Sequence, residues 1–194
     1  MNKKELENSE FLEGYHQLLL KKKWLGDIYR KFWLYPHINK YLKGNAIDIG
    51  CGNGNFLAYR PNTIGVDVNK FNVDYCMRQG FKAILVGDDL PFEANSFDSA
   101  NMDNVLEHIE DPSKILEETK RVLRTGGTLA VGVPARRGFE WDQDHKVFYS
   151  EEKLKKTIEC FGFKQIHTFH MPLKSTFLEN RMKFYIYYSV FIKD

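Results

Sequence analysis

Residues 46–57 of this chain read AIDIGCGNGNFL, and this stretch decides the fold. A short apolar run, a turn with glycine at alternate positions and a new apolar segment indicate a buried strand, a tight turn and a helix start. Glycine accepts positive φ and lets the backbone come close to a ligand. Asp48 ends the strand, where an acid disfavours a phosphate but attracts a cationic amine. The turn therefore predicts a site for a nucleoside that carries an amino acid.

Composition narrows the class of protein. The chain has 194 residues, enough for one domain with a full core. Its formal net charge of +2 is too small to argue for a nucleic-acid partner. Three cysteines at irregular spacing form neither a disulfide framework nor a zinc pattern, and no apolar run is long enough to cross a membrane. We expect a cytoplasmic protein, a monomer or a homodimer, with no membrane or nucleic-acid partner.

Outward from the glycine turn, the chain alternates strands and helices. Residues 4–42 are predicted to be helical in about two pieces. They belong to an N-terminal helical cap that consists of residues 1–44. Short apolar runs without alternation, typical of strands covered on both faces, then predict seven strands. These are residues 46–49, 63–68, 82–87, 97–103, 127–133, 163–170 and 183–192. The fold class is α/β: a Rossmann-like, doubly wound core over residues 45–194, with a mostly parallel seven-stranded sheet and an antiparallel last strand.

Polar residues follow several of the predicted strands, at the sheet edge where ligands bind in such folds. Asp67 lies 17 positions after Gly50, where an acid can bind ribose hydroxyls and would repel a 2′-phosphate. A carboxylate of Asp88 or Asp89 can accept a hydrogen bond from an adenine amino group. Asn104, after the fourth strand, lies beside the expected donor atom.

A series of motifs resembles those of the class I S-adenosylmethionine-dependent methyltransferases, in particular the small-molecule subgroup with a ubiquinone-methylase-like core. They are DIGCGNG at 48–54, GVD at 65–67, LPF at 90–92, SFD at 96–98, VLEHI at 105–109 and LRTGG at 123–127. The resemblance covers about residues 45–165. It implies S-adenosylmethionine as cofactor and S-adenosylhomocysteine as product.

The resemblance also implies a set of cofactor-binding residues. They are Asp48, Gly50, Cys51, Gly52, Gly54, Asp67, Val68, Asp88, Asp89, Leu90 and Asn104. In the family, the glycine turn surrounds the methionine part, the acid after the second strand holds the ribose, and the loop after the third strand surrounds the adenine. That loop is shorter here than the family's usual one, which leaves open whether Asp88 or Asp89 meets the adenine.

Methyl transfer requires a base only when the acceptor must lose a proton. His108 and His145 are the candidate bases, and no cluster with metal-ligand spacing stands out, so no metal is expected. Residues 134–146, a long polar and aromatic segment, are predicted to form a lid or acceptor site. Arg136 and Arg137 within it either hold an anionic acceptor or form a solvated pair.

The sequence therefore predicts a methyltransferase that acts on a small-molecule acceptor, by O-methylation. Two alternatives remain open: a cofactor-binding module without catalysis, and a protein methyltransferase. Residues 101–104 lack the Asn/Asp-Pro-Pro-aromatic pattern of nucleic-acid amino methylation, and no cysteine follows a proline. The third glycine of the turn has the wrong spacing for a nicotinamide dehydrogenase.

Overall fold

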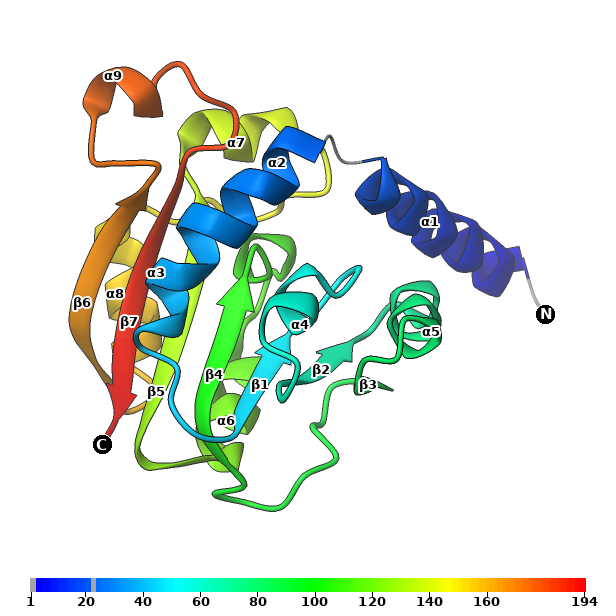
Figure 1. Cartoon of the computed structure of the whole chain (residues 1–194), viewed down its shortest axis with the longest axis horizontal. Coiled ribbons are helices and arrows are strands. Elements are labelled where there is room, and N and C mark those ends of the chain that lie inside the picture. The colour runs from blue at the N-terminus through cyan, green and yellow to red at the C-terminus, as the bar shows by residue number, and fades with distance from the viewer. Residues whose placement is uncertain (1–2, 22–23) are drawn as a thin grey trace.

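The computed structural model describes residues 3–21 and 24–194, and it begins with two helical runs (Figure 1). The first is α1 (Lys3–Leu20). The second is continuous and consists of α2 (Trp24–Tyr29), a π-helical turn η1 (Arg30–Leu34) and α3 (Tyr35–Asn39). The prediction of about two helical pieces is confirmed, except at residues 22 and 23, which lie outside the described residues.

A seven-stranded sheet forms the centre of the molecule. Its strands are β1 (Ala46–Ile49), β2 (Ile64–Asp67), β3 (Ala83–Leu85), β4 (Phe97–Asp103), β5 (Leu123–Pro134), β6 (Phe163–Met171) and β7 (Ile186–Lys193). The spatial order is β3-β2-β1-β4-β5-β7-β6, and β7 alone runs antiparallel to its neighbours. The predicted sheet is confirmed, with β5 starting earlier than expected because Leu123 already pairs with Phe97.

The aromatic last strand lies inside the sheet, between β5 and β6. Tyr187, Tyr188 and Phe191 are each at most 3% exposed, because neighbouring strands and helices cover both of their faces. Burying an aromatic side chain is among the larger contributions to a hydrophobic core. This segment is therefore a core strand.

Helices cover both faces of the sheet, as a doubly wound fold requires. On one face, η1 and α3 pack on β5–β7, while α4 (Asn55–Tyr59) and α5 (Lys70–Arg78) lie over β1–β3. On the other face, α6 (Ser113–Val122) and α8 (Glu151–Glu159) bury Leu116, Val122, Leu154 and Ile158 in the main core (Figure 1). No helix in the described part of the chain is both long and apolar enough to span a lipid bilayer.

Three short helices lie in segments where the sequence predicted none. They are η2 (Leu106–His108), α7 (Arg136–Trp141) and α9 (Thr176–Glu179). Each is too short for a 3.6-residue apolar period to show. Two of them, η2 and α7, follow β4 and β5 directly and so lie at the sheet edge that carries the predicted site.

Candidate functional site

The sheet's order reverses between β1 and β4, and ligands of such sheets bind at the carboxyl ends of these strands. Asp48 and Asn101 are directly paired there, and the Asn101 amide Nδ2 donates to Asp48 Oδ1 at 2.7 Å. Both side chains are buried, and Asn101 Oδ1 has no hydrogen-bond partner among the described residues. Burial raises the pKa of Asp48 to about 7. A buried carboxylate beside an unpaired amide oxygen fits a ligand that brings a cationic amine.

The glycine turn folds back against β2. The backbone N–H groups of Gly50 and Cys51 both donate to Val66 O, at 2.8 and 3.0 Å. Gly50 has a φ of +73°, and a Cβ there would lie 2.4 Å from a methyl carbon of Val105. Only glycine fits, so the turn lies closely against the segment that follows β4. The Cys51 side chain lies in a small core with Leu57 and Cys76, and it contributes only backbone to the site.

Asp67 organises the loops around it. Its Oδ2 accepts from Gly52 N at 2.8 Å and from Asn72 Nδ2 at 3.3 Å, while Oδ1 accepts from Asn69 N at 2.8 Å. A carboxylate oxygen can accept two hydrogen bonds, so Oδ1 keeps one acceptor position for a ligand hydroxyl. Burial raises the pKa of Asp67, although these hydrogen bonds oppose the shift. The predicted ribose acid is thus also a structural residue of the turn.

The second half of α1 lies over this edge of the sheet through polar contacts. Asn69 Nδ2 donates to Leu12 O at 2.8 Å, and Asn53 Nδ2 donates to Leu19 O at 3.3 Å. His16 Nδ1 lies 2.9 Å from the amide oxygen of Asn72. Helix α1 is therefore attached to the predicted cofactor loops themselves.

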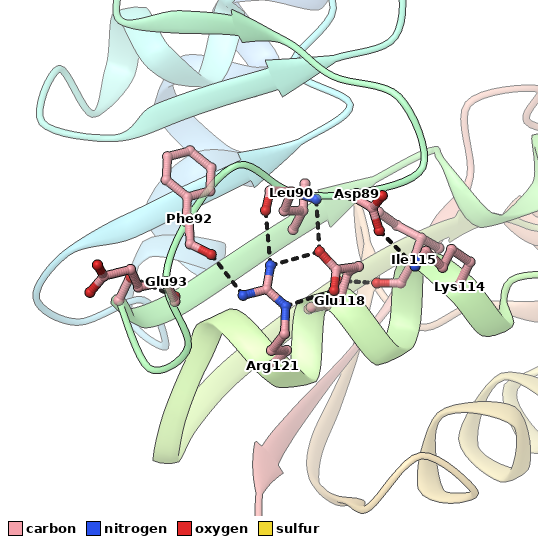
Figure 2. Close-up of polar contacts among 10 residues, drawn as sticks. Asp89, Leu90, Phe92, Glu93, Lys114, Ile115, Glu118 and Arg121 are labelled. Atoms are coloured by element: carbon pink, nitrogen blue, oxygen red, sulfur yellow. Dashed lines mark hydrogen bonds and ion pairs between the residues drawn. The ribbon is translucent and has the colours of Figure 1, made fainter.

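The loop after β3 is held in place from α6 (Figure 2). Glu118 Oε2 accepts from the backbone N–H of Leu90 at 2.8 Å, and the Glu118 carboxylate binds the Arg121 guanidinium at 2.7 Å. Arg121 in turn donates to the carbonyl oxygens of Leu90 and Phe92, at 2.9 and 2.7 Å. Bonding to Arg121 lowers the pKa of Glu118 to about 2. This ion pair fixes the backbone of the predicted adenine loop.

The two carboxylates of that loop have different partners. Asp89 lies 2.6 Å from Lys114 Nζ, whereas Asp88 is exposed and has no partner within the described residues. The Leu90 side chain is buried in the main core. Val68, beside Asp67, is 65% exposed and thus open to a ligand.

Asn104 adopts a left-handed backbone with φ of +55° and follows β4 at the same edge. Its side-chain Nδ2 donates to Asp103 Oδ1 at 2.7 Å, and its backbone N–H donates to Gly132 O at 2.9 Å. The bond to Gly132 ties this conformation to β5, and the bond to Asp103 ties it to the end of β4. Asn104 therefore lies at the carboxyl edge of β4, and its role at the donor end of the site stays a prediction.

The two candidate bases, far apart in sequence, lie together. The rings of His108 and His145 make an edge contact with centroids 4.7 Å apart. Glu107 lies against them: its carboxylate is 3.8 Å from His145 Nε2, and both oxygens are buried without a hydrogen-bond partner in the described chain. Burial raises the pKa of Glu107 well above its usual range, and burial together with His145 lowers the pKa of His108.

Tyr15 of α1 lies near both the predicted cofactor loops and the histidine pair. Its ring makes an edge contact with His108, with centroids 6.1 Å apart. Burial raises the pKa of Tyr15, and so do the nearby carboxylates, among them Glu107 and Asp67. Tyr15 therefore lies near both the cofactor-side carboxylate of Asp67 and the imidazole of His108. Trp33 instead lies on the outside, where its Nε1 donates to Pro172 O at 3.1 Å.

Residues 134–146 contribute α7 and the turn that carries His145. Arg136 stacks over Phe148 and lies 3.8 Å from Glu140, and Arg137 donates to Asn180 O at 3.1 Å. Both arginines thus have partners within the chain.

Sequence reasoning missed two members of the site. Asn101 is a buried amide in a central strand, and a polar residue within an apolar run is the signal that could have identified it. The partnership of Glu107 with His145 gave no such signal, because it depends on the path of the loop after α7. Two backbone bonds, from Lys146 N and Val147 N to Glu107 O, bring that loop to η2.

Comparison with known proteins gives one family and many similar folds. Residues 47–131 match the family described as a methyltransferase domain. A solved structure from Thermotoga maritima, described as an S-adenosylmethionine-dependent methyltransferase and possible histamine N-methyltransferase, has a TM-score of 0.74. It is 20% identical to this chain, and the match covers 96% of this chain and 97% of that one.

Curated relatives match over part of their length. An uncharacterized protein of Methanocaldococcus jannaschii is 36% identical over 136 residues, which are 64% of this chain and 66% of the relative. A tRNA (carboxymethyluridine(34)-5-O)-methyltransferase of Schizosaccharomyces pombe is 32% identical over 130 residues, 59% of this chain and 57% of that protein. The chain thus spans less than two thirds of the length of these relatives.

Proposed function

We propose that this chain, whose residues 47–131 match the methyltransferase domain family, is a class I S-adenosylmethionine-dependent methyltransferase that methylates an oxygen atom of a small-molecule acceptor. The observation that supports the cofactor part of the proposal is the pair Asp48–Asn101 at the switch point, next to the glycine turn. The cofactor supplies an electrophilic methyl group on a sulfonium. The relative that acts on a 5-O position supports oxygen as the acceptor atom.

Each part of the cofactor is assigned to a residue whose side chain can accept its hydrogen bonds. Asp48 and the free oxygen of Asn101 would hold the amino group, and Asp67 would accept a ribose hydroxyl through Oδ1. Asp88 is the better candidate for the adenine, because Asp89 is paired with Lys114. These residues bind and orient, and the transfer itself needs mainly an aligned acceptor.

The N-terminal helix α1 contributes to the site by lying against the predicted cofactor loops. Helix α1 is bonded to the loops that carry Asn53 and Asn69, and its Tyr15 covers the space beside His108. Excluding water strengthens the electrostatic interactions inside a site and prevents side reactions. We propose that α1 closes the site in this way, and that His108 and His145 line its acceptor side.

The remaining features of the proposal concern the cellular setting. A cytoplasmic location suits three unpaired cysteines, of which Cys51 and Cys76 are buried and Cys160 is exposed. A small-molecule acceptor is proposed rather than a protein or nucleic acid, because the candidate bases His108 and His145 are largely buried and Tyr15 of α1 contacts His108. The chain acts as a monomer or a homodimer in this proposal.

Transfer of a labelled methyl group tests the function. The purified protein is incubated with methyl-labelled S-adenosylmethionine and a panel of alcohols, phenols, carboxylic acids and amines, and with the small-molecule and macromolecular fractions of a cell extract. Label in an oxygen-containing small molecule is the expected result. Label only in protein or tRNA would replace the acceptor class, and cofactor binding without any transfer would favour the non-catalytic module.

A further inference from the structure

We propose that Glu107, His108 and His145 form a binding site for one divalent first-row transition cation, such as Mn²⁺ or Zn²⁺. Each of the three side chains offers one ligand atom, and these atoms all lie within 4.8 Å of one another. Bound to a metal at about 2.1 Å each, such atoms would be roughly 3.4 Å apart in a tetrahedral site. A small inward movement of the side chains is therefore enough.

The buried carboxylate is the first argument for a cation. Glu107 is 1% exposed, and neither of its side-chain oxygens has a hydrogen-bond donor within the described chain. Burying a carboxylate without a partner is costly, and buried charges in proteins are paired or coordinate metals. Both oxygens of Glu107 therefore lack a hydrogen-bond partner in the described chain, and a bound cation would compensate their charge.

The second argument is how the two imidazoles are held. His108 Nδ1 donates to Asp144 Oδ2 at 3.0 Å, and His145 Nδ1 donates to the carbonyl oxygen of Phe139 at 2.9 Å. Metal-binding histidines characteristically donate their other ring N–H to a carboxylate or a backbone carbonyl, which fixes the tautomer. Both rings then keep the Nε2 lone pair for a ligand, and His145 Nε2 already faces Glu107 at 3.8 Å.

Charge is the third argument. Asp142 lies 3.9 Å from His145 Nε2, and Asp144 is bonded to His108. Within residues 3–21 and 24–194, no lysine or arginine forms an ion pair with Glu107, Asp142 or Asp144. The cluster is thus an uncompensated group of carboxylates around two imidazoles. Mixed imidazole and carboxylate ligands favour first-row cations such as Mn²⁺, Fe²⁺ and Zn²⁺.

The place of the cluster gives the cation a role, which rests on the proposed function. It lies next to Tyr15 of α1, in the segments that follow β4 and β5 at the same sheet edge as the cofactor loops. A bound divalent cation lowers the pKa of a coordinated hydroxyl and orients it. His108 and His145 would then act on an acceptor hydroxyl through the cation rather than as free bases.

Metal binding is measured directly on the full chain after treatment with a chelator. Mn²⁺ binding is followed by electron paramagnetic resonance and Zn²⁺ binding by calorimetry, for the wild type and for Glu107→Gln and His145→Gln. We expect one cation per wild-type chain, a loss of affinity of about 100-fold in either ligand variant, and about 10-fold in Asp144→Asn, which removes a residue that orients a ligand. His167→Gln, at an exposed histidine on β6, is the matched control and keeps full affinity.

Folding and function are separated from metal binding by two further readouts. Mn²⁺ should raise the melting temperature of the wild type and of His167→Gln but not of Glu107→Gln. S-adenosylhomocysteine binding should persist in every variant. Wild-type protein that binds S-adenosylhomocysteine but neither cation would overturn the metal site and leave the methyltransferase function standing. Cation binding without S-adenosylhomocysteine binding would do the reverse.

Discussion

The Glu118–Arg121 ion pair is expected to control both the stability of the fold and the order of the loop at residues 88–92. Glu118→Gln removes the charge that accepts from Leu90 N and from two nitrogens of Arg121, at 2.7–2.8 Å. The Glu118 side chain is 10% exposed, so water cannot replace these bonds fully, whereas the Arg121 side chain is 37% exposed and partly rehydrates.

The expected loss of stability follows from the number and burial of these hydrogen bonds. A hydrogen bond to a charged group contributes about 1.5–3 kcal/mol, and breaking a fully buried pair costs about 3–5 kcal/mol. Because Arg121 regains some solvent, we expect Glu118→Gln to lower the free energy of unfolding by about 3 kcal/mol. At this chain length, that is a fall in melting temperature of roughly 6–12 °C. The matched control is Glu152→Gln, whose ion pair with Lys156 is exposed to solvent, and we expect no measurable change in its stability.

The pH dependence of the free energy of unfolding tests the contribution of Glu118 independently. The pKa of Glu118 falls from 4.5 to about 2 on folding, so its stabilisation is complete above pH 4.5 and disappears as the pH falls toward 2. Urea unfolding of both proteins, followed by circular dichroism at pH 7 and pH 3, measures the difference. A difference at pH 7 no larger than that of Glu152→Gln, or one that does not shrink at pH 3, would refute the reasoning.

Two further substitutions test the site. Asp48→Asn should weaken S-adenosylhomocysteine binding yet stabilise the free protein at pH 8. Burial raises the pKa of Asp48 from 3.8 to about 7, so the ionised carboxylate costs stability as the pH rises through that range. Unfolding and calorimetry at pH 5 and pH 8 check both effects, and a variant less stable than the wild type at pH 8 would contradict this account. Gly54→Ala places a Cβ 2.8 Å from Cys76 Sγ at a φ of +76°, whereas Gly80→Ala, at +82°, meets nothing within 4 Å. Thermal unfolding should therefore show Gly54→Ala to be less stable than Gly80→Ala by about 1–3 kcal/mol, and equal losses would show that packing around the turn is loose.

The fold was predictable because its signals are local. The run at residues 46–57 and the short apolar segments after it give strands close to those observed, since both faces of the sheet are covered. The place of β7 between β5 and β6 was not derivable from those segments, because strand order depends on contacts between distant parts of the chain. Short helices such as α9 lack enough residues for a period.

The site residues likewise divide into those placed by the local sequence and those whose contacts depend on tertiary structure. The glycine turn, Asp48 and Asp67 lie where the sequence placed them, since each follows its own strand. Asp89 and Leu90 lie in the predicted loop, but their side chains pair with Lys114 and enter the core, and these partners come from α6 or from the interior. The meeting of Glu107 with His145 likewise depends on tertiary structure.

The central claim is that the carboxyl edge of β1, β2 and β4 binds S-adenosylmethionine. Titration calorimetry with S-adenosylhomocysteine tests it most directly, on the wild type, on Asp67→Asn and on Asp74→Asn, a control in α5 whose carboxylate pairs with Lys70. The account predicts binding to the wild type and to the control, and affinity at least about tenfold weaker, or 1.4 kcal/mol, in Asp67→Asn. Failure of the wild type to bind, or equal affinity in all three proteins, would contradict it.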